Sequence, residues 1–358
     1  DINWARRQVA QRCIYGVEMN PLAVELEKVS IWLRTLAAEQ PLAFLDHHLK
    51  TGNSLAGSDI EVVLDNGEPD NRAEEGQLTL QESFDRTRQQ ALEHVTDRFE
   101  ELLAIDNETL DDVKEMEAVY EEVRDDPLYQ HLIAMANVHT AEQFGLDVPD
   151  DAYERMAEAL RDGSWDNIEA QDWYRSAQTT AKDERFFHWE LEFPIAFYEQ
   201  EGDRKEDAGF DAVIGNPPYL AFQEGSEAAR EYFRAQYQTA HRNYDVYVLF
   251  VEKAINLLHE EDGWFGYIIP NKFITSQYGE ELKQFIPEYA QIDSLIDFGD
   301  GEVFDDATNY VCIPILRTGK HTQPTSYMKN TNPVEAVQSA SLGENWGEIP
   351  VDAMKDWN

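Results

Sequence analysis

The sequence predicts an α/β fold: a doubly wound, mostly parallel sheet with a long helical insertion. Apolar strand patterns alternate with amphipathic helix patterns in residues 1–57 and again in residues 186–330. Such alternation is typical of a parallel sheet covered by helices. Between these regions the chain is rich in Glu, Asp, Gln, Arg and Ala and has apolar residues at helical spacing, which predicts helices without strands.

Residues 1–65 begin the sheet. The run CIYGVE (13–18) has a strand pattern, and NPLAVELEKVSIWLRTLA predicts a helix with Asn20 as its N-cap and Pro21 in its first position. LKTGNSLAG (49–57) predicts a short strand followed by a loop bounded by glycines. Apolar residues of the helix recur at helical spacing and are expected to face a sheet: Leu22, Leu26, Val29, Leu33 and Leu36.

Residues 66–185 read as a helical insertion. LTLQESFDRTRQQALEHVTDRFEELLA, TLDDVKEMEAVYEEV and DDAYERMAEALRDG predict amphipathic helices, the last ending at Gly163. The insertion carries no chemical motif, so we expect a polar arm that packs against the α/β body.

Residues 186–330 return to the sheet. Five runs predict strands: FFHWELEFPIAF, FDAVIG, DGWFGYIIP, IDSLIDFG and YVCIPILRTG. Three runs predict the helices between them: SEAAREYFRAQYQTA, DVYVLFVEKAINLLHEE and QYGEELKQFIPEY. Residues 331–358 read as a loop-like linker toward a further domain.

The charge balance is strongly acidic. Lys and Arg number 29 against 71 Asp and Glu, so the formal net charge is -42. A surface this acidic repels nucleic acid in dilute salt. Either the partner is not a polyanion, or the protein works in concentrated salt, where charges are screened. The acids are scattered through regular segments rather than gathered in a tail, which favours the second interpretation, a halophile's surface.

The two cysteines, Cys13 and Cys312, are far apart in sequence and each lies in an apolar context. We expect both to be buried, reduced thiols. The sequence has no signal-peptide pattern and no long apolar span, so we expect a cytoplasmic protein without membrane contact. It begins with Asp1 rather than Met, which we interpret as a piece of a longer protein.

The stretch GFDAVIGNPPYLAF (209–222) ends a strand pattern with an unusual set of residues. In a doubly wound sheet, ligands bind beyond the carboxyl ends of the strands. Asn216 offers a side-chain carbonyl there. Pro217 and Pro218 have no N–H donors and leave their backbone carbonyls available. Tyr219 adds a flat aromatic face.

These four residues predict a rigid cup of acceptors beside a stacking surface. The cup suits a planar group that carries an NH2, such as the exocyclic amine of adenine. The lone pair of that amine is delocalised into the ring, so the nitrogen is a poor nucleophile. Two acceptors on its hydrogens favour a tetrahedral, more nucleophilic nitrogen, so no strong base is needed before attack. The alternative is a Pro-Pro turn that only closes a strand.

Asn-Pro-Pro-Tyr after FDAVIG resembles the catalytic motif of amino-group methyltransferases that use S-adenosylmethionine. Further runs match in order: FFHWELEFPIAF upstream, then YVLFVEKAINLL, GWFGYIIPNKFI and IDFGDGEVFDDATNYVCIPIL downstream. Together they resemble the N6-adenine DNA methyltransferases of fused type II restriction-modification enzymes and of BREX phage-exclusion systems. The resemblance implies a Rossmann-like methyltransferase sheet, with double-stranded DNA and other subunits of a defence system as partners.

The resemblance also implies a cofactor site in residues 1–65. IYGVEMNPLAVELEKVSIWL resembles the family's second cofactor motif. Glu18 would accept hydrogen bonds from the ribose hydroxyls of S-adenosylmethionine, and Met19 would pack against its adenine; a surface acid and a core methionine are the alternatives. TGNSL resembles the third motif, in which the family often has Asp where this chain has Asn53. Asn53 would meet the cofactor's adenine, or it forms a plain Asn-Ser turn.

The implied DNA site has a base-binding and a phosphate-binding part. Asn216, Pro217 and Tyr219 would bind the target amine, with Pro218 beside them. Phe304 would stack on the other face of a flipped adenine, which must leave the duplex to react; the alternative is a core phenylalanine. Basic residues of AAREYFRAQYQTAHRNYDVY and IIPNKF could meet phosphates, or else pair with acids of their own helix: Arg230, Arg234, His241, Arg242 and Lys272.

The chain departs from the family pattern in two places. The Gly-rich first cofactor motif is expected on a strand before Asp1, so the first cofactor-binding strand and loop are missing here. The target-recognition domain is expected after residue 358. No Asp…Glu-x-Lys nuclease pattern is present.

The Asn-Pro-Pro-Tyr motif also occurs in protein-glutamine methyltransferases, so the motif does not identify the substrate. An inactive DNA-binding or complex-forming subunit is a third possibility.

Overall fold

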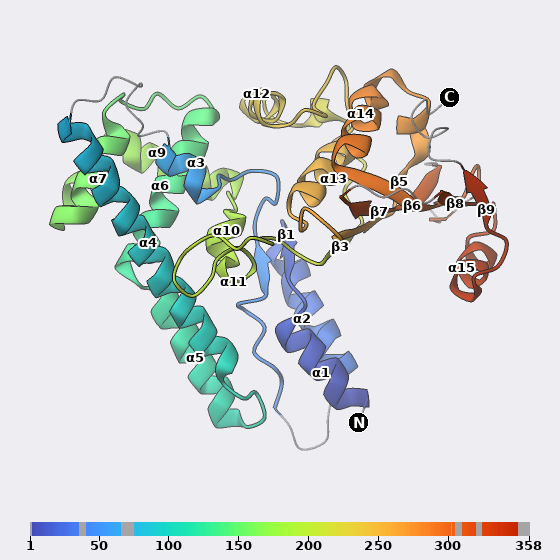
Figure 1. The fold of residues 1–358 in the computed structure, drawn as a ribbon, viewed down its shortest axis with the longest axis horizontal. Helices are drawn as coiled ribbons and strands as arrows, with labels where there is room; N and C mark the ends of the chain where they lie inside the picture. The colour runs from blue at the N-terminus through green and yellow to red at the C-terminus, as the bar shows by residue number, and fades with distance from the viewer. Residues whose placement is uncertain are drawn as a thin grey trace. The chain divides into compact units, whose positions relative to one another are not determined.

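The computed structural model describes residues 2–35, 41–65, 75–301, 303–304, 310–319 and 324–349. The chain divides into two compact units, Asp1–Lys205 and Glu206–Asn358 (Figure 1). The first unit holds a two-stranded sheet and the helical insertion, and the second holds a larger sheet. Residues 186–205 therefore lie within the first unit.

The elements of the first unit are, in chain order, α1 (Ile2–Arg12), β1 (Gly16–Glu18), α2 (Pro21–Thr35), β2 (Leu49–Thr51), α3 (Ile60–Asp65), α4 (Glu75–Ala104), α5 (Leu110–Arg124), α6 (Pro127–Gln143), α7 (Ala152–Asp162), α8 (Asp166–Glu169), α9 (Asp172–Glu184), α10 (Trp189–Glu192) and α11 (Pro194–Phe197). β1 and β2 are parallel, so their carboxyl ends, Glu18 and Thr51, lie side by side.

The strand at 13–18 is shorter than expected, because α1 continues to Arg12 and only Gly16–Glu18 pairs with β2. Cys13 is consequently exposed, and the expectation that both thiols are buried is wrong for this residue. Cys312 is buried as expected.

The start of α2 confirms the predicted cap. Asn20 Oδ1 accepts the Leu22 N–H at 3.0 Å, and Pro21 is the first helical residue. The predicted apolar face is wrong: Leu22 and Leu33 are each 66% exposed, and Leu26 and Val29 are exposed too. Leu36 lies outside the described residues.

A second stripe explains this error. Val24 is buried in a cluster with Ala43, Leu45 and Leu49, and Ile31 and Trp32 pack against that cluster. This stripe has helical spacing as well, and it is the face of α2 that covers the small sheet. Periodicity reveals that a helix has an apolar face, but it does not select between two such faces.

The insertion confirms the helices predicted in it. Thr109 and Asp112 form a capping box at the start of α5, and Gly163 ends α7 with a φ of 73°, a conformation in which glycine is favoured. The centre of the insertion is α6, an apolar helix that packs against α5, α7 and α9. Its Tyr129 and Met135 are fully buried.

FFHWELEFPIAF was expected to be a strand, and this is wrong: it forms α10 and α11 instead. Two acids, the buried Glu190 and the partly buried Glu192, explain the change. Glu190 pairs with Arg204, and Glu192 accepts from Lys50 at 2.8 Å and Arg124 at 3.0 Å. A half-buried strand would direct both acids to one face, whereas the short helix α10, which carries both, directs them to different partners.

The elements of the second unit are, in chain order, β3 (Ala212–Gly215), η1 (Phe222–Glu224), α12 (Glu227–Gln236), α13 (Tyr247–Asn256), β4 (Trp264–Tyr267), β5 (Ile269–Pro270), η2 (Asn271–Ile274), η3 (Gln277–Gly279), α14 (Glu280–Tyr289), β6 (Ala290–Asp297), β7 (Val311–Thr318), β8 (Thr325–Lys329), α15 (Pro333–Leu342) and β9 (Gly347–Ile349). Each strand and helix predicted between 209 and 318 is present.

The sheet of the second unit has the order β3-β4-β7-β6-β8-β9, and β5 pairs with β7. β3 is parallel to β4 and β6 is parallel to β8, whereas β7 is antiparallel to β4, β5 and β6. The sheet is therefore mixed rather than mostly parallel. No helix lies between β6 and β7 in the described residues, and a chain without such a crossover returns antiparallel.

The chain after residue 330 was expected to be loop-like, and for 333–349 this is wrong. Asn332 caps α15, Pro333 is its first residue, and Gly343 ends it with a φ of 71°. Ala336 of α15 is buried in a hydrophobic cluster of the second unit, together with Ile296, Phe298, Val311 and Met328. The N-cap, Pro and Gly were all readable in the sequence.

Candidate active site

The predicted catalytic motif lies at the carboxyl end of β3, as expected. Asn216 directly follows the last strand residue and is exposed, and within the described part of the chain its side chain makes no hydrogen bond. Pro217 is buried and Pro218 is exposed. The amide of Asn216 is thus held by a rigid, anchored backbone and is available to a ligand.

Tyr219 is fixed at both ends of its side chain. Its hydroxyl donates to the Ile268 carbonyl at 2.8 Å, and its ring meets Tyr247 edge to face, with centroids 6.4 Å apart. The ring is half-buried and packs against the cluster that contains Ile296, Phe298 and Ala336. Burial, and then the nearby Cys312, raise the pKa of Tyr219 to about 12. Tyr219 is therefore a neutral, positioned aromatic surface and not a base.

The strand before the motif is more exposed than its sequence predicted. β3 pairs with β4 alone among the described strands, and Ile214 is 84% exposed. On its paired side, β3 approaches β4 closely: a Cβ on Gly215 would come within 2.8 Å of the Tyr267 ring. This contact favours glycine immediately before Asn216 and brings the motif against β4.

Phe304 lies near the same cluster as Tyr219. Its side chain is 36% exposed, so it is not a core phenylalanine. Its neighbour Val303 packs against the cluster that Tyr219 also contacts. Tyr219, which follows β3, and Val303, which follows β6, thus pack against the same cluster, and Phe304 is the next residue after Val303. Residues 305–309 lie outside the described chain.

Four of the five predicted phosphate-binding residues make no ion pair in the described part of the second unit. Arg230 Nε donates to the Ser226 carbonyl, Arg234 stacks over the Phe222 ring at 5.1 Å, and Arg242 contacts Gln277. Lys272 is exposed. The alternative, in which helix α12 neutralises its own arginines with acids at i,i+4, is not what the described residues show.

His241 differs from these residues, because its ring nitrogen lies 3.9 Å from Glu281. It remains exposed.

The predicted cofactor residues gather in the first unit, at the carboxyl ends of β1 and β2. Glu18 is half-buried, and its Oε1 accepts the Asn20 N–H at 2.9 Å. Its backbone carbonyl accepts the Gly52 N–H at 3.1 Å, which ties the two predicted cofactor segments together. Met19 is exposed, not a core residue. An acceptor carboxylate beside an exposed apolar side chain fits the ribose and adenine of S-adenosylmethionine.

Asn53 forms the turn that was considered as its alternative. Its Oδ1 accepts the Leu55 N–H at 3.2 Å, and its Nδ2 donates to the Glu184 carbonyl at 3.4 Å. A carbonyl oxygen has two lone pairs, so the turn leaves Oδ1 able to accept one more donor.

Residues 185–189 also contact both cofactor segments, and no role was predicted for Arg185. The Asn53 N–H donates to the Arg185 carbonyl at 2.7 Å, and the Arg185 guanidinium donates to the Met19 carbonyl. The intervening insertion separates Arg185 from Met19 by 166 residues. No local sequence signal marks such a contact.

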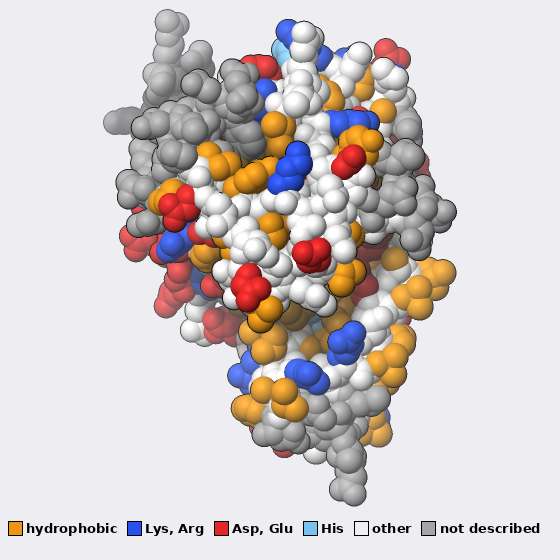
Figure 2. All heavy atoms as spheres, turned by 90° about the vertical axis from the view of Figure 1, so that its right-hand side faces the viewer, with side chains coloured by type: hydrophobic (Ala, Val, Ile, Leu, Met, Phe, Trp, Pro, Cys, Tyr) orange, Lys and Arg blue, Asp and Glu red, His pale blue; other side chains and the backbone are white. Residues whose placement is uncertain are grey.

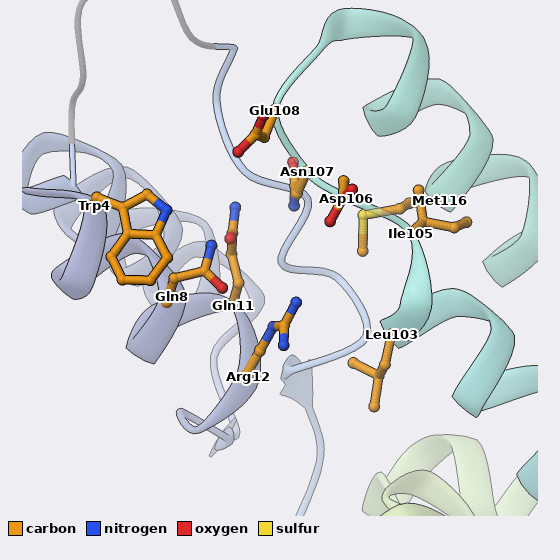
Figure 3. Close-up of a pocket in the computed structure, with 10 residues that line it drawn as sticks. All are labelled: Trp4, Gln8, Gln11, Arg12, Leu103, Ile105, Asp106, Asn107, Glu108 and Met116. Carbon is orange, nitrogen blue, oxygen red and sulfur yellow. The ribbon is translucent and has the colours of Figure 1, made fainter.

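A cavity of about 310 Å³ lies elsewhere in the first unit, between α1 and the connection from α4 to α5 (Figure 3). Trp4 and Arg12 line one side, and Asp106 and Met116 line the other. It contains none of the predicted site residues. Among the described residues, no group of His, Cys, Asp and Glu could hold a metal ion, and no helix is long and apolar enough to cross a membrane.

The fold is α/β, and the family match identifies it as that of a methylase, a class of protein whose cofactor is S-adenosylmethionine. The chain belongs to the Eco57I restriction-modification methylase family, which it matches over residues 12–304. The resemblance to the methyltransferases of restriction-modification enzymes is thereby confirmed.

Three curated relatives illustrate the match. The type II restriction enzyme and methyltransferase RM.Eco57I of Escherichia coli is 34% identical over 33% of this chain and 12% of its own length. The type II methyltransferase M.BstVI of Geobacillus stearothermophilus is 30% identical over 32% of this chain and 21% of its own. A Methanocaldococcus jannaschii restriction enzyme and methyltransferase, RM.MjaORFECS2P, is 24% identical over 85% of this chain and 25% of its own. The chain thus spans a quarter or less of these relatives.

Among solved structures, the type IIG restriction endonuclease BpuSI overlaps 83% of this chain and 42% of its own, at 13% identity and a TM-score of 0.34. The type ISP enzyme LlaGI, solved with a DNA substrate mimic, overlaps 64% of this chain and 24% of its own, at 17% identity and a TM-score of 0.34. Likeness at this level supports no conclusion about function.

Proposed function

We propose that this chain is the methyltransferase part of a longer enzyme that methylates the N6 amine of a flipped adenine in double-stranded DNA, in restriction-modification or phage defence. The observation that carries the proposal is the end of β3. Asn216 presents an amide there that makes no hydrogen bond to any described residue, beside two prolines and an anchored tyrosine ring.

Each residue of the motif has a defined task in this proposal. The Asn216 side-chain carbonyl and the Pro217 carbonyl accept from the two amine hydrogens, which drives the nitrogen toward a tetrahedral geometry. Tyr219 supports one face of the base and Phe304 the other. S-adenosylmethionine supplies an electrophilic methyl group for in-line displacement. The protein contributes position and amine polarisation, and no ionised base is required.

Two features favour DNA over a protein glutamine. A glutamine amide needs no second aromatic platform, whereas Phe304 is exposed near the cluster that anchors Tyr219. Arg230, Arg234, Arg242 and Lys272 make no ion pair in the described residues of an otherwise acidic chain, which suits phosphate contacts. Protein-glutamine methylation remains the rival activity, and an inactive DNA-binding subunit the non-enzymatic one.

The test is a methyl-transfer assay with the full-length protein in concentrated potassium chloride. Labelled S-adenosylmethionine is incubated with unmodified DNA and, separately, with a mixture of proteins. Asn216→Ala removes the amide and is expected to lower the rate about 100-fold or more. Because Asn216 is exposed, the melting temperature of the Asn216→Ala protein should equal that of the parent protein. Asn167→Ala removes another exposed asparagine, on α8, and should leave the rate unchanged.

The location of the label distinguishes DNA methylation, protein-glutamine methylation and an inactive subunit. Label in DNA adenine that is lost in Asn216→Ala supports the proposal. Label in protein transfers the function to glutamine methylation. A folded protein that binds the cofactor but labels neither substrate contradicts a catalytic role for the motif.

A further inference from the structure

The helical insertion ends in a segment that contacts both predicted cofactor segments. We call residues 185–189 the return segment, because they follow α9 directly and lead back to the small sheet. The Phe187 N–H donates to the Ala56 carbonyl at 2.8 Å, and Phe186 forms a parallel bridge with Asn53. Trp189 Nε1 donates to the Ser54 carbonyl at 3.0 Å. The return segment thus runs along the loop that contains Asn53.

Two glycines let the return segment approach this closely. A Cβ on Gly52 would come within 2.5 Å of the Phe187 ring, and a Cβ on Gly57 within 2.0 Å of the Phe187 carbonyl. Neither Gly52 nor Gly57 could therefore be replaced by a residue with a side chain unless the return segment moved. The glycines that bound TGNSLAG are therefore explained by the approach of the return segment, which holds the loop on both sides of Asn53.

Arg185 links the loop to the other cofactor segment. Its carbonyl accepts the Asn53 N–H at 2.7 Å, while its guanidinium donates to the carbonyl of Met19. One residue thus fixes the positions of Met19 and Asn53, the two residues assigned to the cofactor's adenine.

The backbone conformation of Arg185 disfavours arginine, which indicates that the side chain makes a contact that offsets the strain. Arg185 has a φ of 56° and ends α9, a position in which glycine is the usual residue. An arginine is strained there, and its side chain is exposed. Its guanidinium therefore contributes little to a core, and its bond to Met19 is the contact that glycine would lack.

We propose that Arg185 is a positioning residue for S-adenosylmethionine, and that the helical insertion serves to deliver the return segment that fixes the adenine side of the cofactor site. The inference rests on the proposed cofactor roles of Glu18, Met19 and Asn53. It assigns a task to the insertion, which carries no chemical motif of its own.

Arg185→Gly tests this directly, because it removes the guanidinium and relieves the backbone strain together. We expect the full-length protein to melt at the same or a higher temperature, and the dissociation constant for S-adenosylmethionine, measured by titration calorimetry, to rise about 3- to 10-fold. Arg185→Lys keeps a donor and should recover part of the affinity. Asn345→Gly, at another left-handed residue with a φ of 62°, is the matched control and should leave the affinity unchanged.

Glu18→Ala separates the two proposals. If Glu18→Ala leaves the affinity unchanged, the proposed cofactor site itself is misplaced. If Glu18→Ala weakens binding but Arg185→Gly does not, the positioning role is overturned while the site stands. A lower melting temperature in Arg185→Gly with unchanged affinity would make Arg185 a purely structural residue.

Discussion

Asn216 and Tyr219 are neighbours in the motif but are held in opposite ways. The Tyr219 hydroxyl is committed to the Ile268 carbonyl, so the ring keeps one orientation before any base arrives. The Asn216 amide has no hydrogen-bond partner in the described residues, so its acceptor is available to an incoming amine. A fixed platform beside an unpaired acceptor is what a rate-enhancing site requires, because positioning costs are met during folding.

Tyr219→Phe separates the two parts of the tyrosine. It removes the hydroxyl that donates to Ile268 but keeps the ring. We expect the free energy of unfolding to fall by about 1 kcal/mol and methyl transfer to fall less than about tenfold, whereas Tyr219→Ala should lose most activity. Chemical denaturation and the methyl-transfer assay measure the two effects.

The matched control for this substitution is Tyr310→Phe, at a tyrosine that is 50% exposed. Tyr310→Phe should change neither the free energy of unfolding nor the rate of methyl transfer. Equal activity in Tyr219→Phe and Tyr219→Ala would show that the ring is not part of the site.

Glu18 and Asn216 could be proposed from the sequence because Glu18 ends one strand pattern and Asn216 directly follows another, and strand ends are where such folds bind ligands. Arg185 could not be located in this way. Its importance depends on a contact with Met19 across 166 residues, and the sequence around it shows only the end of a helix. A site residue that acts through a distant backbone carbonyl leaves no local pattern.

At the level of elements, the return segment is held by a buried histidine as well. The Ser58 N–H donates to His188 Nδ1 at 3.0 Å, so that nitrogen must be unprotonated, and Nε2 lies 2.9 Å from Asn137 Oδ1 on α6. Burial lowers the pKa of His188 from 6.5 to about 4. The contact between the insertion and the loop thus exists only with a neutral imidazole.

This histidine predicts acid sensitivity of the first unit. In the unfolded chain His188 takes up its proton near pH 6.5, and in the folded chain only near pH 4. Its contribution to stability is therefore complete above pH 6.5 and is lost as the pH falls toward 4. Between about pH 7.5 and about pH 5 the loss should be about 2 kcal/mol from this group, measured by urea denaturation at each pH.

His188→Asn provides the comparison for this prediction, because it keeps an acceptor near Nδ1 but does not titrate. The pH dependence of its stability should be shallower than that of the parent protein. An unchanged slope in His188→Asn would contradict the assigned tautomer.

Helices that begin and end at residues with capping chemistry could be predicted from the sequence. Elements whose conformation depends on contacts with residues distant in sequence could not. α5 and α7 begin and end at residues with clear capping chemistry, Thr109 and Gly163. FFHWELEFPIAF failed because its acids, Glu190 and Glu192, find cations that are distant in sequence. α15 is a different case, since Asn332 and Pro333 mark its start and Gly343 its end in the sequence itself.

At the scale of the whole molecule, the charges fall into two populations. The side chain of Glu192 is only 14% exposed and pairs with Lys50 and Arg124. Loss of solvent raises its pKa, but the two cations lower it to about 2. Such a pair is screened only weakly by salt. Most acids instead lie at the surface, where exposed hydrophobic, acidic and basic side chains lie close together on the face shown in Figure 2. Only this second population responds to ionic strength.

The formal net charge of -42 predicts that salt stabilises this protein. Repulsion among surface carboxylates destabilises the compact state. Raising potassium chloride from about 0.1 M to about 1 M shortens the screening length from about 10 Å to about 3 Å. We therefore expect the melting temperature to rise by about 5 °C or more over this range, followed by circular dichroism.

A charge-reduced variant distinguishes this repulsion from a general effect of salt on apolar surface. Glu115, Glu117 and Glu121 are exposed acids on α5. Their joint replacement by glutamine removes three negative charges and leaves the core untouched. If repulsion is the cause, the triple variant melts higher than the parent at low salt and gains less from added salt. If both proteins gain equally, salt acts through apolar surface, and the acidic composition is not an adaptation to concentrated salt.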